Sequence, residues 1–198
     1  MNEQDDGVTK RMVRAATRIE PNELKATILS FLFVFILMAA YFILRPVRNA
    51  MASDWSDAEL STLWTGTFVF SLIAVSIYGG IIPRVRFKYL VPGVYVFFTL
   101  SFFGFYLAAM SVENRDAVNA AFYVWVSVFS LFHVSVFWSF MSDIYNRRQA
   151  PRLFAFIAAG GSIGAIAGPA ITAFFAGALG TYNLLLLSAT MLLIPIPI

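Results

Sequence analysis

The sequence predicts an all-α integral membrane protein in which six transmembrane helices form one domain and both termini are cytoplasmic. Apolar residues make up 60% of the 198 residues and charged residues only 13%, with a mean hydropathy of +0.77. A soluble domain averages about a quarter charged residues. The apolar residues also fall into six long stretches, each close to the roughly 20 residues that a membrane helix needs.

The basic residues support the same fold class, because they crowd into alternate gaps between the six apolar stretches. Eleven lie on one side of the predicted membrane, and three lie on the other, namely Arg45, Arg48 and Arg115. Cytoplasmic loops carry the Lys/Arg excess. The chain is therefore expected to start inside and to cross the membrane an even number of times. The net charge of +3 is interpreted as topological, and no nucleic-acid partner is expected.

The expected elements follow in order along the chain. Residues 1–24 form a cytoplasmic tail with a short interfacial helix, because Lys10, Arg11, Arg14 and Arg18 have near-helical spacing before Pro21. This helix either binds anionic lipid or is a solvated arm. Residues 25–198 form the transmembrane domain. Its spans are expected at 26–44, 62–82, 89–111, 117–141, 153–176 and 182–198, as helices because lipid offers no partners for backbone amides.

The two ends of the apolar region carry further expectations. No cleavage pattern follows the first span, so we interpret it as a retained transmembrane helix. The last span ends at Ile198 in alternating Ile and Pro, without a basic flank. This predicts that more protein normally follows, and a natural six-helix protein is the alternative.

Small residues mark one face of the fifth span. Gly160, Gly164 and Gly168 are four residues apart, and Pro169 follows as a place where the helix can bend. Small residues allow another helix backbone to approach closely. The pattern fits a static packing face and a surface between moving helices equally well.

Arg45 and Arg48 are the exceptional basic residues, since they lie together on the side that is poor in positive charge. Arg binds phosphate or carboxylate through two parallel hydrogen bonds. If the helix continues through Pro46, both side chains could face one cavity and hold an anion. The alternative is contact with lipid headgroups or pairing with Asp54, Asp57 or Glu59.

Two other sets of polar residues are candidates for function. Asp143 and Arg147 are four apart, which fits an ion pair on a helix, and with Arg148 they form a candidate cytoplasmic gate or a fixed surface bridge. His133 is the one ionisable residue near the middle of a span, and it is a candidate for proton coupling or a neutral, hydrogen-bonded side chain.

The sequence offers little for catalysis or metal binding. It has no cysteine and one histidine, which excludes thiolate sites and multi-histidine metal sites within the chain. It contains no HExxH, no Gly-rich phosphate loop and no serine beside a plausible base. We expect no enzyme activity, no cofactor and no metal.

Three blocks of sequence resemble bacterial transporters of the major facilitator superfamily, and in particular the branch related to ATP:ADP exchange translocases. They are Tyr41–Ala50 (YFILRPVRNA), Val136–Asp143 (VFWSFMSD) and Arg152–Gly164 (RLFAFIAAGGSIG). Gly164-x-x-x-Gly168-Pro169 is also similar to the antiporter motif of that superfamily. Two positions depart from the family pattern: Pro83 stands where the loop motif has Asp, and Asn49 where Asp is expected.

The resemblance implies a twelve-helix transporter of the bacterial inner membrane, of which this chain is the N-terminal half. It implies alternating access, a small anionic solute such as a nucleotide, and a missing C-terminal six-helix half as partner. Tyr41, Arg45 and Arg48 would bind the solute. The glycines of the fifth span with Pro169 would support the movement, and Asp143, Arg147 and Arg148 would gate it. A membrane scaffold derived from a half-transporter is the alternative.

Overall fold

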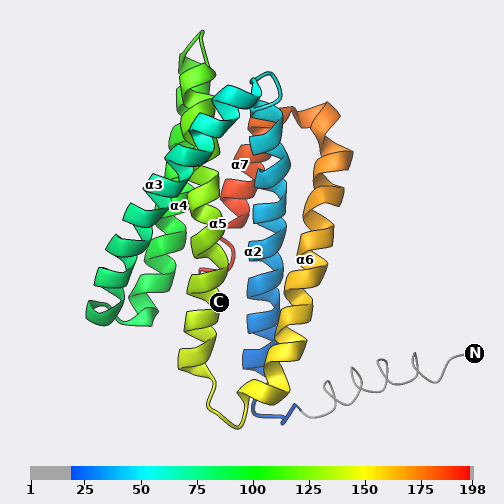
Figure 1. Ribbon diagram of the computed structural model, residues 1–198. Coiled ribbons are helices and arrows are strands. Elements are labelled where there is room, and N and C mark those ends of the chain that lie inside the picture. The colour runs from blue at the N-terminus through cyan, green and yellow to red at the C-terminus, as the bar shows by residue number, and fades with distance from the viewer. Residues whose placement is uncertain (1–18, 197–198) are drawn as a thin grey trace, which may run out of the picture.

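The computed structural model describes residues 19–196, and this part of the chain is helical without a strand (Figure 1). The elements are α2 (Leu24–Met51), α3 (Asp57–Ile81), η1 (Ile82–Arg84), α4 (Phe87–Ser111), α5 (Asp116–Ile144), α6 (Ala150–Leu179) and α7 (Thr181–Met191). Five of them are long and apolar enough to cross a membrane. The all-helical architecture expected from the sequence, with several helices long and apolar enough to span a membrane, is therefore confirmed, and the predicted tail helix lies outside the described residues.

The helices run alternately up and down, so the chain turns lie at two opposite ends (Figure 1). Seven of the described basic residues lie at the end where α2 begins: Lys25, Arg84, Arg86, Lys88, Arg147, Arg148 and Arg152. Arg45, Arg48 and Arg115 lie near the other end. The division of charge that the sequence suggested is thus present in the fold.

Helix α3 begins five residues before the span expected from its apolar run. Ser56 and Glu59 form a capping box, in which the Ser56 amide donates to the Glu59 carboxylate at 2.8 Å and the Glu59 amide donates to the Ser56 hydroxyl at 3.4 Å. This reciprocal pair satisfies amides that would otherwise lack partners at the helix start. The helix therefore starts at polar residues that hydropathy alone does not include.

Two prolines have opposite consequences. Pro46 lies inside α2, which continues to Met51 and so extends beyond the expected span. The expected sixth span, 182–198, is wrong in its extent: α7 has 11 residues, about 16 Å, against a hydrocarbon core of about 30 Å. Beyond Met191 the backbone forms three-residue turns, in which Leu193 donates to Thr190 and Ile194 to Met191, and Pro195 has no amide proton with which to continue an α-helix.

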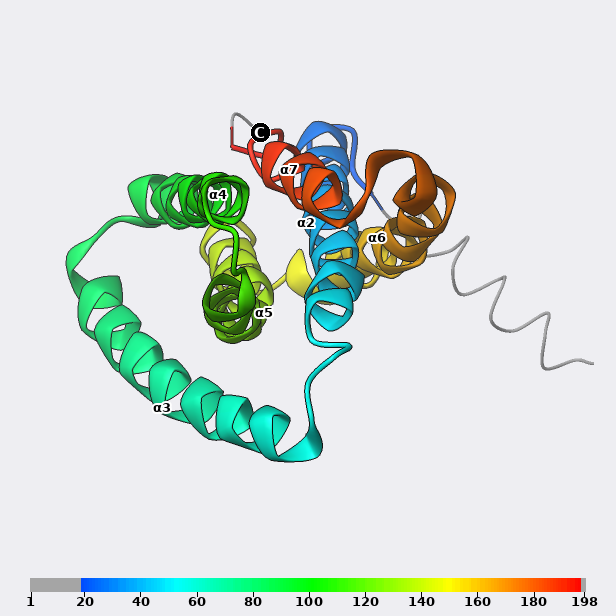
Figure 2. The same ribbon diagram turned by 90° about the horizontal axis from the view of Figure 1, so that it is seen from above.

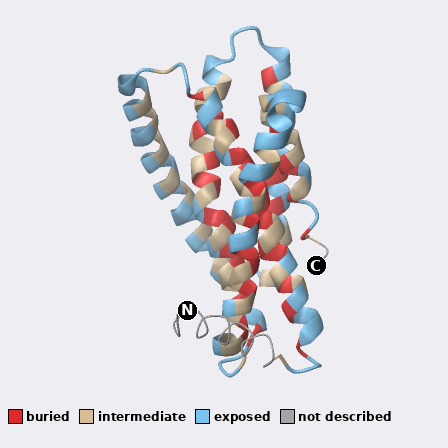
Figure 3. Ribbon diagram, turned by 90° about the vertical axis from the view of Figure 1, so that its right-hand side faces the viewer, coloured by how far each residue is buried: buried red, intermediate tan, exposed pale blue. Residues whose placement is uncertain are grey.

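Helix α2 is the centre of the bundle. It packs against α5, α6 and α7, while α5 also packs against α3 and α4, and α4 packs against α7 (Figure 2). The buried residues gather along these contacts (Figure 3). Helix α3 is an outer helix that packs against α5, and none of its residues is buried.

The contact between α2 and α6 depends on the glycine face of the fifth span. A Cβ atom added at Gly160 would lie 2.6 Å from the carbonyl oxygen of Phe31, and one added at Gly168 would lie 2.7 Å from that of Ala39. At Gly164 it would overlap the carbonyl oxygen of Phe35. The two backbones therefore touch, and this face is used for close packing within the six-helix unit.

We expect Gly164→Ala to destabilise the protein, because the new methyl group has to push α6 away from α2. The expected cost is about 1–3 kcal/mol, as for other overpacked sites. Thermal unfolding in detergent measures it. Gly177→Ala in the same helix is the matched control, since nothing lies within 4 Å of its added Cβ. Equal melting temperatures for the two variants would contradict close packing at Gly164.

Candidate functional site: the seam between α2 and α5

An aromatic pair joins α2 to α5 near the middle of the bundle. The rings of Tyr41 and His133 are stacked, with centroids 4.3 Å apart and an angle of 29° between the planes. His133 is 3% exposed, and its Nδ1 lies 3.3 Å from the carbonyl oxygen of Phe129. Its Nε2 has no hydrogen-bond partner among the described residues. Because a carbonyl oxygen only accepts, Nδ1 carries the proton of the neutral ring, and Nε2 is left as a buried acceptor without a partner among the described residues.

Arg48 lies seven residues after Tyr41, on the same face of α2, and also contacts α5. One terminal nitrogen donates to Ser127 Oγ at 3.1 Å, while Nε and the other terminal nitrogen donate to Asn49 Oδ1 at 3.2 and 3.1 Å. The guanidinium lies over the ring of Tyr123, 4.9 Å from its centroid. These partners are neutral, so the positive charge of Arg48 is oriented without being neutralised.

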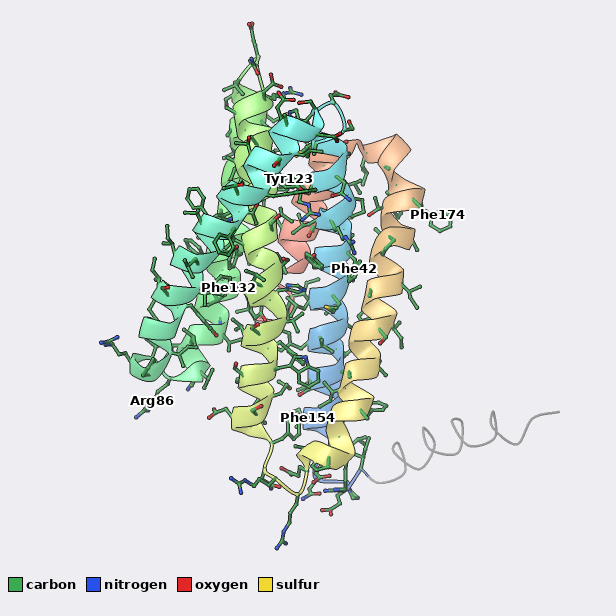
Figure 4. All side chains as sticks on the ribbon, in the orientation of Figure 1. Phe42, Arg86, Tyr123, Phe132, Phe154 and Phe174 are labelled. Atoms are coloured by element: carbon green, nitrogen blue, oxygen red, sulfur yellow. The ribbon has the colours of Figure 1, made fainter. Side chains whose placement is uncertain are left out.

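The aromatic platform under Arg48 is itself held in place. The indole of Trp64 on α3 donates to the Tyr123 hydroxyl at 3.1 Å, and the Trp55 ring lies edge-on to Tyr123 at 6.1 Å. Figure 4 shows Tyr123 near the end of the bundle opposite to the start of α2. Residues from three helices therefore fix the position of one cation.

Arg45 differs from Arg48. The helix continues through Pro46, as a shared site would require, but the Arg45 side chain is exposed, and its nearest aromatic ring is Phe42 at 5.9 Å. Within residues 19–196, neither arginine forms an ion pair with the acidic residues that follow, Asp54, Asp57 and Glu59. The structure places Tyr41 and His133 in contact, puts Arg48 about two helical turns farther along the same face of α2, and leaves Arg45 exposed.

At the opposite end, the expected ion pair between Asp143 and Arg147 is wrong. Helix α5 ends at Ile144, so the helical spacing that would bring the two side chains together stops between them. Both residues are exposed, as is Arg148. The Asn146 side chain instead organises this turn by accepting from the amides of Arg148 and Gln149 at 2.9 and 3.1 Å.

A different charged cluster ties the start of α2 to the start of α6. The carboxylate of Glu23 accepts from Arg152 at 2.8 Å, from the Gln149 side chain at 3.0 Å and from the Glu20 amide at 3.2 Å. A second oxygen, from the Glu20 side chain, lies 3.8 Å from the same Arg152 nitrogen. This cluster fixes the two glycine-packed helices to each other at their first turns.

The environment of Glu23 shifts its acidity. Burial raises the pKa of the Glu23 carboxyl, but the hydrogen bonds from Gln149 and the Glu20 amide and the charge of Arg152 outweigh that effect. The pKa of Glu23 therefore lies below its ordinary value, and the carboxylate is ionised at neutral pH.

Sequence reasoning missed Glu23, Ser127 and Tyr123. Glu23 pairs with Arg152 across more than half of the chain, a contact that spacing along one helix does not indicate. One signal was present: Glu23 stands just before the first apolar run, where an uncompensated carboxylate would be costly beside the membrane. No comparable signal marks Ser127 or Tyr123 among the many Ser and aromatic residues of the spans.

Within residues 19–196, no group of three or more His, Cys, Asp or Glu could hold a metal ion. Comparison with protein-family models, with curated proteins and with solved structures gives no match for this chain. The observations define a helical protein with several apolar helices of membrane-spanning length and a buried seam of polar and aromatic residues.

The ionised Glu23 carboxylate stabilises the fold at neutral pH and loses this effect in acid. We therefore expect Glu23→Gln to lower the stability of the protein at neutral pH. A carboxyl with a depressed pKa stabilises the fold fully above its unfolded pKa, about 4.3, and this contribution disappears as the pH falls through the lower folded pKa. Unfolding of wild type and Glu23→Gln in detergent between pH 7 and pH 3 measures this. The difference in the free energy of unfolding between the two proteins should be largest at neutral pH and should disappear in acid.

The matched control is Glu20→Gln, since Glu20 is 61% exposed and its carboxylate lies farther from Arg152. Its effect should be small at every pH. A difference in stability between wild type and Glu23→Gln that stays constant from pH 7 to pH 3 would contradict the role of the Glu23 charge.

Proposed function

We propose that this chain is one six-helix half of a secondary transporter of the major facilitator type, which carries a small anionic solute by alternating access. A nucleotide is the proposed solute class, and the bacterial inner membrane is the proposed location. A second six-helix half would complete the transport path.

The neighbour relations of the six helices carry this proposal. Helices α2, α3 and α4 can be matched in order with α5, α6 and α7. Under this match the α2–α6 contact corresponds to the α5–α3 contact, and the α2–α7 contact corresponds to the α5–α4 contact. The pairs α2–α5 and α4–α7 become themselves. Corresponding helices run in opposite directions (Figure 1). Such 3+3 inverted repeats are nested within each half of major facilitator transporters.

One pair departs from this symmetry. Helices α6 and α7 pack together beyond their tight turn at Gly180, and α3 and α4 have no equally close contact. The departure follows from the position of α3, which packs against α5 but not closely against α4. It affects the outer helices and leaves the central pair, α2 and α5, in matching positions.

The candidate binding residues lie on that central pair, where such transporters hold their substrates between repeats. Arg48 supplies an oriented positive charge, and Tyr41 and His133 supply a stacked aromatic and imidazole pair. The charge of Arg48 suits a phosphate, and the partly exposed ring of Tyr41, about two helical turns away, suits a base, which together favour a nucleotide. His133 Nε2 is the atom proposed to take up a proton if transport is proton-coupled.

We expect Arg48→Ala to weaken anion transport strongly and Arg45→Ala to weaken it less, because Arg48 is held by Ser127 and Tyr123 whereas Arg45 is exposed. Loss of a charged hydrogen-bond pair costs about 1.5–3 kcal/mol, which corresponds to a rise in KM of roughly 10- to 150-fold. The measurement is exchange of labelled nucleotides in liposomes that contain the protein together with the second half implied by the proposal.

Arg115→Ala is the control, since Arg115 is the third basic residue at the same end and lies over Tyr182 rather than at the seam. If the double variant Arg45→Ala/Arg48→Ala exchanges nucleotides as fast as the wild type, the proposed anion site is wrong. Binding of nucleotide without any exchange would favour a non-transporting membrane partner.

A further inference from the structure

A groove lies between α3, α4 and α5, outside the seam. Its volume is about 300 Å³, and its walls are apolar side chains from all three helices. They include Ile73 and Ile77 of α3, Phe97 of α4, and Trp125 and Phe132 of α5. Ile73, Ile77 and Phe97 are each at least half exposed, so the groove opens toward the surroundings of the bundle.

The groove runs toward a basic turn. Helices α3 and α4, which form two of its walls, are joined through η1, and Arg84, Arg86 and Lys88 are all exposed there. Figure 4 shows Arg86 at the end of this helix pair, with Phe132 farther along the bundle. The apolar groove therefore lies between two helices that are joined by a turn with three positive charges.

These charges lack acidic partners. No Asp or Glu occurs between Glu59 and Glu113 in the sequence, so neither α4 nor the second half of α3 carries a negative charge. Within residues 19–196, no ion pair involves Arg84, Arg86 or Lys88. The turn therefore presents an uncompensated positive field at the end of the helices.

We propose that the groove binds one anionic phospholipid, with an acyl chain along the apolar walls and the headgroup phosphate at the basic turn that joins α3 to α4. Basic pockets between membrane helices on the cytoplasmic side bind anionic headgroups, and that leaflet is the one rich in anionic lipid. The acyl chain would cover the apolar walls of the groove, and the phosphate would lie at the basic turn where α3 ends and α4 begins.

The shape of the groove favours a lipid over a helix of another protein. A helix with its side chains is about 10 Å across, which a groove of about 300 Å³ cannot enclose. An acyl chain can lie along Phe97, Phe132 and Trp125, which line the groove, without separating the helices. A soluble anion would use the basic turn and leave the apolar walls uncovered.

Trp125 provides the measurement, because it lines the groove and bromine atoms on lipid chains quench tryptophan on contact. Trp55→Phe, Trp64→Phe and Trp138→Phe leave Trp125 as the one tryptophan. The protein is placed in phosphatidylcholine vesicles that contain brominated phosphatidylglycerol or brominated phosphatidylcholine at equal mole fraction. Brominated phosphatidylglycerol is expected to quench on the order of tenfold more effectively at low mole fraction.

The headgroup part is tested with Arg86→Gln/Lys88→Gln, which should abolish the preference for the anionic lipid. Arg147→Gln/Arg148→Gln removes two exposed charges from the neighbouring turn and should leave it intact. Binding of the acyl chain is tested with Ala74→Phe, which fills the groove and should reduce quenching by both lipids. Val75→Phe is its control, since Val75 is 50% exposed and lies off the groove.

Native mass spectrometry of the unmodified protein gives a second readout that does not depend on the tryptophan variants. One phosphatidylglycerol is expected to be retained after phosphatidylcholine has been removed. Equal quenching by the two lipids would reduce the site to ordinary lipid contact and overturn the proposal. Absence of quenching by either lipid would also overturn it, because the groove would then be closed or occupied by protein.

Discussion

The backbone contact between α2 and α6 is the constraint on which the rest of the bundle depends. Apolar side chains gain little by leaving lipid for protein, so membrane helices need close packing or polar contacts to associate. Three glycines at four-residue intervals provide the close packing, since at each of them a methyl group would meet a backbone carbonyl of α2. The Glu23–Arg152 pair then fixes the register of the two helices at their first turns.

This contact determines which faces of α2 remain for other partners. With one face against α6, a second face meets α7, where the Ser188 hydroxyl donates to the Ala40 carbonyl oxygen at 2.7 Å. The face that carries Tyr41 and Arg48 is left for α5. The aromatic and basic residues of the seam are thus oriented by packing on the far side of the same helix, at positions that contact neither the glycines nor Ser188.

Hydropathy and glycine spacing predicted most of the fold, because both reflect constraints that act along one helix. Apolar length marks a helix that can span a membrane, and a four-residue repeat of glycine marks a face that can meet a backbone. The ends of the helices were less predictable. They depend on local chemistry, such as the Ser56–Glu59 capping box and the effect of Pro195, which an average over an apolar window does not register.

The site was predictable only in part, for a different reason. Arg48 and His133 stand out because charged or ionisable residues are rare in such spans. Their partners do not, since Ser127, Tyr123 and Phe129 are ordinary residues of a membrane helix. The predicted Asp143–Arg147 pair shows the limit of spacing as evidence: four residues imply contact only if the helix continues, and α5 ends at Ile144.

The inverted relation between the two helix triplets explains why a groove exists where it does. The pair α3–α5 occupies the position that α2–α6 occupies in the other triplet, but it has no row of glycines at the contact. Gly66 is the one glycine of α3 that approaches α5, and its added Cβ would lie 3.9 Å from Val124, an ordinary separation. Larger side chains hold the two helices apart farther along, and the space between them is the apolar groove. The same difference in glycine content that brings α2 and α6 into backbone contact therefore leaves space between α3 and α5.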